Sequence, residues 1–153
     1  MTVELYDAID RLPFFNPDLD GDEVPPTVES FRAELRTAHG LLICSPEYAH
    51  GVPGVMKNAL DWLVGSTQGE IVDKPVALIN ASPIATHAQA SLIETLRMMS
   101  ARVVADVRLT TSLRSKSYDE MLLRSEPDVL RALSAAFAAL EAAIHLDPEQ
   151  DIV

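Results

Sequence analysis

The sequence predicts an α/β domain built on an open parallel sheet. Short apolar runs of strand length alternate with longer segments in which apolar residues recur every three or four positions. The runs at 41–44 and 75–79 are continuously apolar, which is typical of strands covered on both faces. The chain has 153 residues, of which 48% are hydrophobic and 23% charged. This length and composition favour a single globular domain over residues 1–153.

Four segments are expected to be strands. In residues 3–6, valine and leucine alternate with glutamate and tyrosine, a pattern typical of a partly exposed strand. The two continuously apolar runs at 41–44 and 75–79 are expected to be strands covered on both faces. Residues 103–107 mix apolar residues with an aspartate, which suits an edge strand.

Four amphipathic helices are expected to separate and follow these strands. Their apolar stripes cover residues 28–38, 56–63, 88–99 and 130–144. Gly65 is a plausible stop for the second helix, and Thr86 with Gln89 forms a capping-box pair for the third. The fourth has a candidate cap at Ser125 and a proline at 127 near its first turn. The alternating order predicts right-handed crossovers that place helices on both faces of the sheet.

Two further stretches are expected to lack regular secondary structure. Residues 10–26 form an acidic, proline-rich segment that we expect to be a solvated loop, and residues 110–125 form the second.

The charge balance limits the partners of this chain. It carries 12 lysines and arginines against 23 aspartates and glutamates, a formal net charge of −11. Such a surface repels phosphate backbones and anionic membranes, so we expect neither nucleic acid nor a membrane as partner. No apolar stretch approaches the roughly 18 residues of a membrane span. No secretory signal is visible at the first residues, so a cytoplasmic location is expected.

The single cysteine, Cys44, rules out an internal disulfide framework and a cysteine-rich zinc site. We expect no metal site. Because Cys44 ends an apolar run, it is expected to be a buried structural thiol.

Two loops are candidates for ligand binding, because ligands of open α/β sheets bind beyond the carboxyl ends of the strands. The loop at 45–54 contains two prolines and two glycines, which favour an irregular backbone with N–H groups free to face a ligand. Tyr48 adds an aromatic surface, and His50 adds a polar edge. The loop at 80–85 follows the next strand. Together they suit a flat heteroaromatic ring.

A longer run resembles a known family. Residues 45–62 contain Pro-Glu-Tyr, then Pro-Gly, then Lys-Asn-Ala-x-Asp-Trp. This run resembles the signature of the NADPH-dependent FMN reductases, flavodoxin-like enzymes related to quinone, azo-dye and chromate reductases. The resemblance implies a three-layer flavodoxin-like fold and a homodimer with the flavin near its interface. It also implies FMN as cofactor and NADPH or NADH as substrate. Hydride would pass from the nicotinamide to the flavin and on to a quinone-like or other small acceptor.

The resemblance also implies which residues meet the flavin ring, mainly through backbone groups. These are Pro46, Glu47, Tyr48, Ala49, His50, Gly51 and Ser82. Many relatives have asparagine where this chain has Ala49, so an amide side-chain contact would be lost. The motif residues Lys57, Asn58, Asp61 and Trp62 would order the corner between loop and helix, and no residue is assigned a catalytic role.

One departure from the family pattern bears on affinity. The family begins with a strand, a Gly/Ser-rich loop that cradles the FMN phosphate, and a helix. This sequence opens at what resembles the second strand, so the fold is expected to lack that first strand and helix. The missing strand would lie between residues 3–6 and 41–44. Two alternatives therefore stand beside the enzyme: a cofactor-free flavodoxin-like protein acting through protein contacts, and a truncated gene product with impaired FMN binding.

Overall fold

The computed structural model describes residues 1–21, 23–82, 84–109 and 120–146. Its sheet has three parallel strands in the order β1-β2-β3, where β1 is Leu41–Cys44, β2 is Pro75–Asn80 and β3 is Arg102–Arg108. Every residue of β2 is buried, whereas β1 and β3 are the two edges of this sheet. The predicted α/β class, the two apolar strands and the edge position of 103–107 are confirmed.

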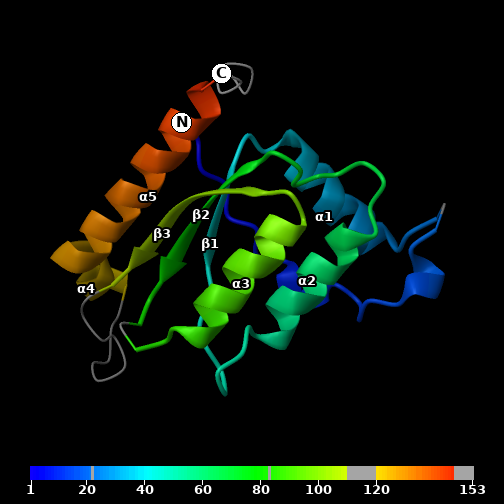
Figure 1. Ribbon diagram of the computed structural model, residues 1–153, viewed down its shortest axis with the longest axis horizontal. Coiled ribbons are helices and arrows are strands. Elements are labelled where there is room, and N and C mark those ends of the chain that lie inside the picture. The colour runs from blue at the N-terminus through cyan, green and yellow to red at the C-terminus, as the bar shows by residue number, and fades with distance from the viewer. Residues whose placement is uncertain (22, 83, 110–119, 147–153) are drawn as a thin grey trace.

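Helices cover both faces of the sheet, as the alternating sequence pattern predicts (Figure 1). Three of them pack on one face: α1 at Pro26–Thr37, α2 at Gly54–Val64 and α3 at His87–Met98. The long helix α5, Pro127–His145, lies on the other face against β2 and β3. A short helix, α4 at Glu120–Ser125, falls within the predicted irregular stretch 110–125, and the rest of that stretch, 110–119, lies outside the described residues.

The core is divided by the alternation of side chains along β2. Val76 and Leu78 join the larger cluster with α1, α2 and α3, whereas Ala77 and Ile79 face Ala136 and Leu140 of α5. Successive side chains of a strand point to opposite faces. A continuously apolar run is therefore needed when both faces are covered, which is the physical basis of the prediction for 75–79. The prediction of one domain over 1–153 stays a prediction.

The predicted strand at residues 3–6 is wrong. This segment pairs with no strand in the part of the chain that the structure describes, and Val3 and Leu5 are 61% and 90% exposed. The segment is anchored at its end by Tyr6, whose ring lies 5.1 Å from that of Phe31. Alternation alone does not make a strand, because its backbone groups need a hydrogen-bonding neighbour. The outer edge of β1 likewise has no partner among the described residues.

The acidic segment 10–26 is not simply a solvated loop. Among its described residues, Ile9–Arg11 and Pro17–Leu19 contribute to two 3₁₀ turns, and Leu12 is buried. Asp20 accepts a hydrogen bond of 2.8 Å from the buried guanidinium of Arg32. A Cβ at position 65 would stand 2.0 Å from Asp20 Oδ2. Gly65 therefore ends α2 as predicted, and it also leaves room for this buried ion pair.

The predicted side-chain caps at the starts of α3 and α5 do not form, although Thr86 is the N-cap residue of α3. Thr86 makes no side-chain cap to α3, and Gln89 is buried and donates instead to Asp106 Oδ1 of β3 at 2.6 Å. The cap position of α5 is Glu126, and the Ser125 hydroxyl donates to the Met121 carbonyl at 3.2 Å. Pro127 is the first residue of α5, as expected. Gln89 is thus drawn into a tertiary contact with β3, whereas Ser125 makes a local bond within α4.

Candidate functional site

The two candidate loops lie at the carboxyl ends of β1 and β2. The first, residues 45–53, connects β1 to α2, and the second, 81–86, connects β2 to α3. β1 and β2 are parallel neighbours with Cys44 paired to Ile79. The two loops therefore leave the sheet at the same end, where both strands terminate. The topology therefore brings together two segments that are about 30 residues apart in sequence.

The tip of the first loop is a tight turn. The N–H of Tyr48 donates to the Gly51 carbonyl at 3.1 Å, and the N–H of Gly51 donates back to the Tyr48 carbonyl at 2.9 Å. The two residues between them, Ala49 and His50, have positive φ values of 49° and 62°. This is the conformation of a type I′ turn, in which glycine, asparagine and aspartate are preferred. Alanine at position 49 is therefore less favourable for this backbone conformation than the asparagine that the family resemblance leads us to expect there.

The turn leaves a small set of backbone donors open. The N–H groups of Glu47, Ala49 and His50 donate no hydrogen bond to any residue that the structure describes. Those of Tyr48 and Gly51 are used inside the turn. A ligand that meets this loop can accept hydrogen bonds from the three open donors, which a tight turn holds in fixed positions.

Side chains of the first loop fasten it to the start of α3. Glu47 Oε2 accepts a hydrogen bond of 2.8 Å from the N–H of Ala88, in the first turn of that helix. A carboxylate at a helix N-terminus satisfies an open donor and complements the helix dipole. The rings of His50 and His87 are stacked with centroids 4.3 Å apart. Glu47 thus supplies the cap that Thr86 was predicted to give.

The second loop is held by Asn80, which sequence reasoning passed over. Its side chain is buried, accepts from the N–H of Ser82 at 3.0 Å and donates to the Ala85 carbonyl. The backbone carbonyl of Asn80 accepts from the N–H of Leu109 at 2.9 Å. An asparagine directly after an apolar run is a signal for such a turn, since its amide mimics backbone groups. Ser82 is placed by this contact, half-buried in the second loop.

A hollow of about 240 Å³ opens beside the first loop. Its walls are mostly apolar and come from three parts of the chain: Ile9, Cys44, Ser45, Pro46, Tyr48, Pro53, Val55 and Met56. The volume lies somewhat below the usual range for ligand pockets, roughly 300–1,000 Å³. A planar ligand would therefore be held on one side and remain partly open to solvent on the other. Tyr48 is 68% exposed, so its ring is available for stacking.

The expectation that Cys44 is a buried thiol is wrong. The residue is exposed and lines the hollow, because it ends an edge strand. Nearby protein atoms nevertheless desolvate the sulfur and raise the pKa of the Cys44 thiol. The thiol form is thus favoured at neutral pH.

The residues predicted to bind the flavin ring occupy different parts of the site. Pro46 and Tyr48 line the hollow, Glu47 and His50 fasten the loop to α3, and Ala49 lies with His50 at the turn. Gly51 closes the turn, and Ser82 lies in the second loop. The hollow is also lined by residues that were not predicted to bind the ring: Ile9, Cys44, Ser45, Pro53, Val55 and Met56.

The downstream motif has a packing role. Asn58 accepts from the N–H of Phe15 at 2.8 Å and donates to the Pro13 carbonyl at 3.0 Å. The indole N–H of the buried Trp62 donates to the same carbonyl at 2.7 Å. Lys57 pairs with Asp61 one turn along the exposed side of α2. These contacts fix residues 13–15 against α2, consistent with the expected ordering of this corner.

Comparison with known proteins supports the family resemblance of this sequence. Residues 1–116 match the family model of NADPH-dependent FMN reductase. An NAD(P)H-dependent FMN reductase of Pseudomonas aeruginosa is 40% identical over 82 residues, which are 54% of this chain and 44% of that protein. A quinone reductase of Escherichia coli is 36% identical over 83 residues, again 54% of this chain and 44% of the relative.

A solved structure shares the fold. FerB, a flavoenzyme NAD(P)H:(acceptor) oxidoreductase from Paracoccus denitrificans, superposes with a TM-score of 0.61 at 24% identity. The match covers 89% of this chain and 75% of FerB. The three-layer α/β arrangement is thus flavodoxin-like, as expected. The chain spans less than half the length of the two curated relatives described above, 44% in each case.

Proposed function

The chain belongs to the NADPH-dependent FMN reductase family, and on this premise we propose that it binds the flavin ring of FMN and acts in an NAD(P)H oxidoreductase. The observation that carries the proposal is the hollow beside residues 46–51. Its mostly apolar walls include the exposed ring of Tyr48, and it lies next to a turn in which the N–H groups of Glu47, Ala49 and His50 donate no hydrogen bond to any described residue.

These features fit a flavin ring. Its flat body is apolar, whereas one edge carries carbonyl and ring-nitrogen acceptors that the open N–H groups can meet. Pro46 and Tyr48 would contact the ring through their side chains, and Glu47, Ala49, His50 and Gly51 would face it through their backbone. Ser82 would approach from the second loop. None of the described residues that line the hollow is basic, so this hollow supplies ring contacts but no charged partner for a phosphate.

When bound, FMN supplies the redox chemistry by accepting hydride from NAD(P)H and passing electrons to a second molecule. The residues of this chain would orient the ring and shield one of its faces from water. The hydrogen bond that the Glu47 carboxylate accepts from the N–H of Ala88 and the stacking of His50 on His87 keep the loop in one position. A loop fixed before the ligand arrives loses less conformational entropy on binding.

The second substrate is proposed to be a small quinone-like acceptor. Relatives are named quinone reductases, and the hollow is open enough on one side for a planar molecule to approach a bound ring. The expected homodimer and cytoplasmic location remain parts of the proposal. No helix within the described residues is both long and apolar enough to cross a bilayer.

The test is an absorption spectrum of the purified chain, followed by titration with FMN and then with NADPH. We expect the flavin band of bound FMN to shift and to bleach when NADPH is added. Riboflavin, which lacks the phosphate, is expected to bind within about tenfold of FMN, because the ring provides the contacts in the hollow. Absence of any spectral change or fluorescence quenching at high FMN would refute the proposal for this chain.

A second candidate function is protein binding without a cofactor. The unpaired outer edge of β1 favours it, since a free strand edge can pair with another polypeptide. The same titration separates the two functions. A chain that forms a complex but leaves FMN fluorescence unchanged would support the second function.

A further inference from the structure

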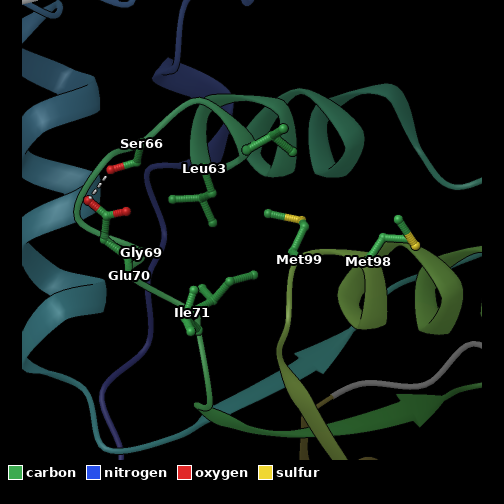
Figure 2. Close-up of a pocket in the computed structure, with 9 residues that line it drawn as sticks. Leu63, Ser66, Gly69, Glu70, Ile71, Met98 and Met99 are labelled. Carbon is green, nitrogen blue, oxygen red and sulfur yellow. Dashed lines mark hydrogen bonds between the residues drawn. The ribbon is translucent and has the colours of Figure 1, made fainter.

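A second cavity, of about 130 Å³, lies between the ends of α2 and α3 and the segment 65–72, which precedes β2. Figure 2 shows the Glu70 carboxylate at its edge, hydrogen-bonded to Ser66. The Glu70 side chain is 0% exposed and also accepts from Arg36 at 3.2 Å, so no ligand in the cavity reaches it. This carboxylate therefore stabilises the fold. The hollow beside the first loop is larger, at about 240 Å³, and the exposed ring of Tyr48 lies on its wall.

One wall of that hollow comes from a segment with no predicted role in ring binding. Ile9, the first residue of the 3₁₀ turn Ile9–Arg11, is half-buried and lines the hollow. The other described residues that line it all lie between 44 and 56. Ile9 is apolar, so it suits the flat body of a ring, whereas the open N–H groups of the turn suit the polar edge. The width of the hollow therefore depends on a side chain outside the first loop and α2.

The segment that carries Ile9 is fastened to α2. Residues 9–15 form a strap that lies against this helix, on the side where Asn58 and Trp62 stand one turn apart. The Pro13 carbonyl accepts from the Asn58 side chain at 3.0 Å and from the indole N–H of Trp62 at 2.7 Å. The N–H of Phe15 donates to Asn58 Oδ1 at 2.8 Å. Asn58 thus uses both ends of its amide to hold the strap.

Further contacts keep the strap in one position. Leu12 is buried in the same core cluster as Trp62, and the Phe15 ring meets the indole edge-on with centroids 5.1 Å apart. Beyond the strap, Arg32 donates to the Trp62 carbonyl at 3.0 Å and to Asp20 at 2.8 Å. The wall that Ile9 provides is therefore in place before a ligand arrives, which lowers the entropy lost on binding.

We propose that Ile9 contacts the flavin ring and that Asn58 is a positioning residue that acts through Ile9. The inference rests on the proposed flavin function. The Ile9 side chain packs against the apolar body of the ring, and its branched Cβ makes it a stiff wall. Asn58 does not touch the ring. It holds the strap on α2, and the strap presents Ile9 to the hollow.

The first experiment is a fluorescence titration of the full chain with FMN and with riboflavin. Ile9→Ala should weaken both ligands alike, by about four- to thirtyfold, because each buried methylene contributes a factor of about four. Ile9→Val removes one methylene and should stay within about fourfold of the unaltered chain. Leu5→Ala is the matched control: it removes as many carbons as Ile9→Ala from a residue that is 90% exposed, and it should change nothing.

NMR of the chain with carbon-13 in the isoleucine methyl groups tests the contact directly. We expect FMN to produce a saturable shift at the Ile9 methyl group. Ile71 serves as the internal control, because it is buried beside the second cavity and should not move.

A double-mutant cycle tests the role of Asn58. Asn58→Ala removes both hydrogen bonds to the strap and should weaken FMN binding by about threefold or more. In the Ile9→Ala background the same change should add less than about twofold, because the wall that Asn58 positions is already gone. A merely structural role would lower the affinity equally in both backgrounds. Urea unfolding of each variant checks that it is folded.

Three outcomes would overturn the inference. Folded Ile9→Ala that binds FMN as tightly as the unaltered chain, or an Ile9 methyl group that stays unmoved at saturation, would remove Ile9 from the site while the flavin function stands. Equal losses from Asn58→Ala in the two backgrounds would refute the positioning role. If the unaltered chain itself leaves FMN fluorescence unchanged, the proposed function fails and the inference fails with it.

Discussion

Replacing Gly51 by valine tests whether a flavin ring meets the first loop. The substitution is tolerated by the protein itself, because a Cβ at position 51 would meet only the Tyr48 carbonyl oxygen, at an ordinary 3.5 Å. Gly51 also has no positive φ, so valine is not strained there. We expect the free energy of unfolding to change by no more than about 1 kcal/mol.

The same side chain would stand where the ring approaches the backbone. Holding the ring away from the loop would break the hydrogen bonds to the open N–H groups of Glu47, Ala49 and His50. At about 0.5–1.5 kcal/mol each, losing two or three of them costs roughly 1–4.5 kcal/mol. With tenfold in affinity for each ~1.4 kcal/mol, FMN should bind about five to a thousand times more weakly.

The assay is quenching of FMN fluorescence, with urea unfolding of the same samples to check the fold. Gly21→Val is the matched control. Gly21 lies in the segment before α1, and a Cβ at this position would have no neighbour within 4 Å. It should leave the affinity unchanged. If folded Gly51→Val binds FMN as tightly as the unaltered chain, the ring does not lie against this loop.

Three other perturbations follow from the geometry of the site. Ala49→Asn should stabilise the chain by up to about 1 kcal/mol in urea unfolding, because asparagine tolerates positive φ better than alanine; a destabilised variant would contradict the turn. Glu47→Ala should cost about 1 kcal/mol by removing the cap on Ala88, whereas Glu47→Gln keeps an acceptor and should lose less; equal losses would refute the cap. Alkylation of Cys44 should be slow at neutral pH and accelerate as the pH rises past 9, because the raised pKa of the thiol leaves little thiolate at lower pH. Bound FMN should protect the thiol from alkylation. If saturating FMN leaves the labelling rate unchanged, the flavin ring lies elsewhere.

The sequence predicts most of the sheet because a strand that is buried on both faces must be apolar at every position. Residues 75–79 are apolar at every position since alternate side chains enter two different clusters. The same reasoning fails at residues 3–6. There the alternation is present, but a strand also needs a neighbour to share hydrogen bonds, and no pattern within four residues reports one.

Contacts between distant residues explain the other differences. The capping box at Thr86 and Gln89 satisfies a local rule, yet Glu47, 41 residues away from Ala88, occupies the helix terminus. The acidic segment looks solvated, yet Asp20 is buried because Arg32 of α1 reaches it. Such pairings depend on the folded chain and are not visible in local sequence.

The candidate loop could be located from sequence, whereas its conformation could not. Its place after an apolar strand and its prolines and glycines indicated a rigid ligand-binding segment. The positive φ values fall on Ala49 and His50, however, and not on the glycines. Sequence preferences for turns give no warning of an alanine in this conformation, because the flanking hydrogen bonds between Tyr48 and Gly51 impose it.

The most direct test of the flavin-binding loop is an amide NMR titration of the nitrogen-15-labelled chain with FMN. The account predicts that the largest saturable shifts occur at the open N–H groups of Glu47, Ala49 and His50, with smaller ones at Ser82. Saturation of FMN binding with these amides unmoved, or with the largest shifts on another part of the chain, would contradict it.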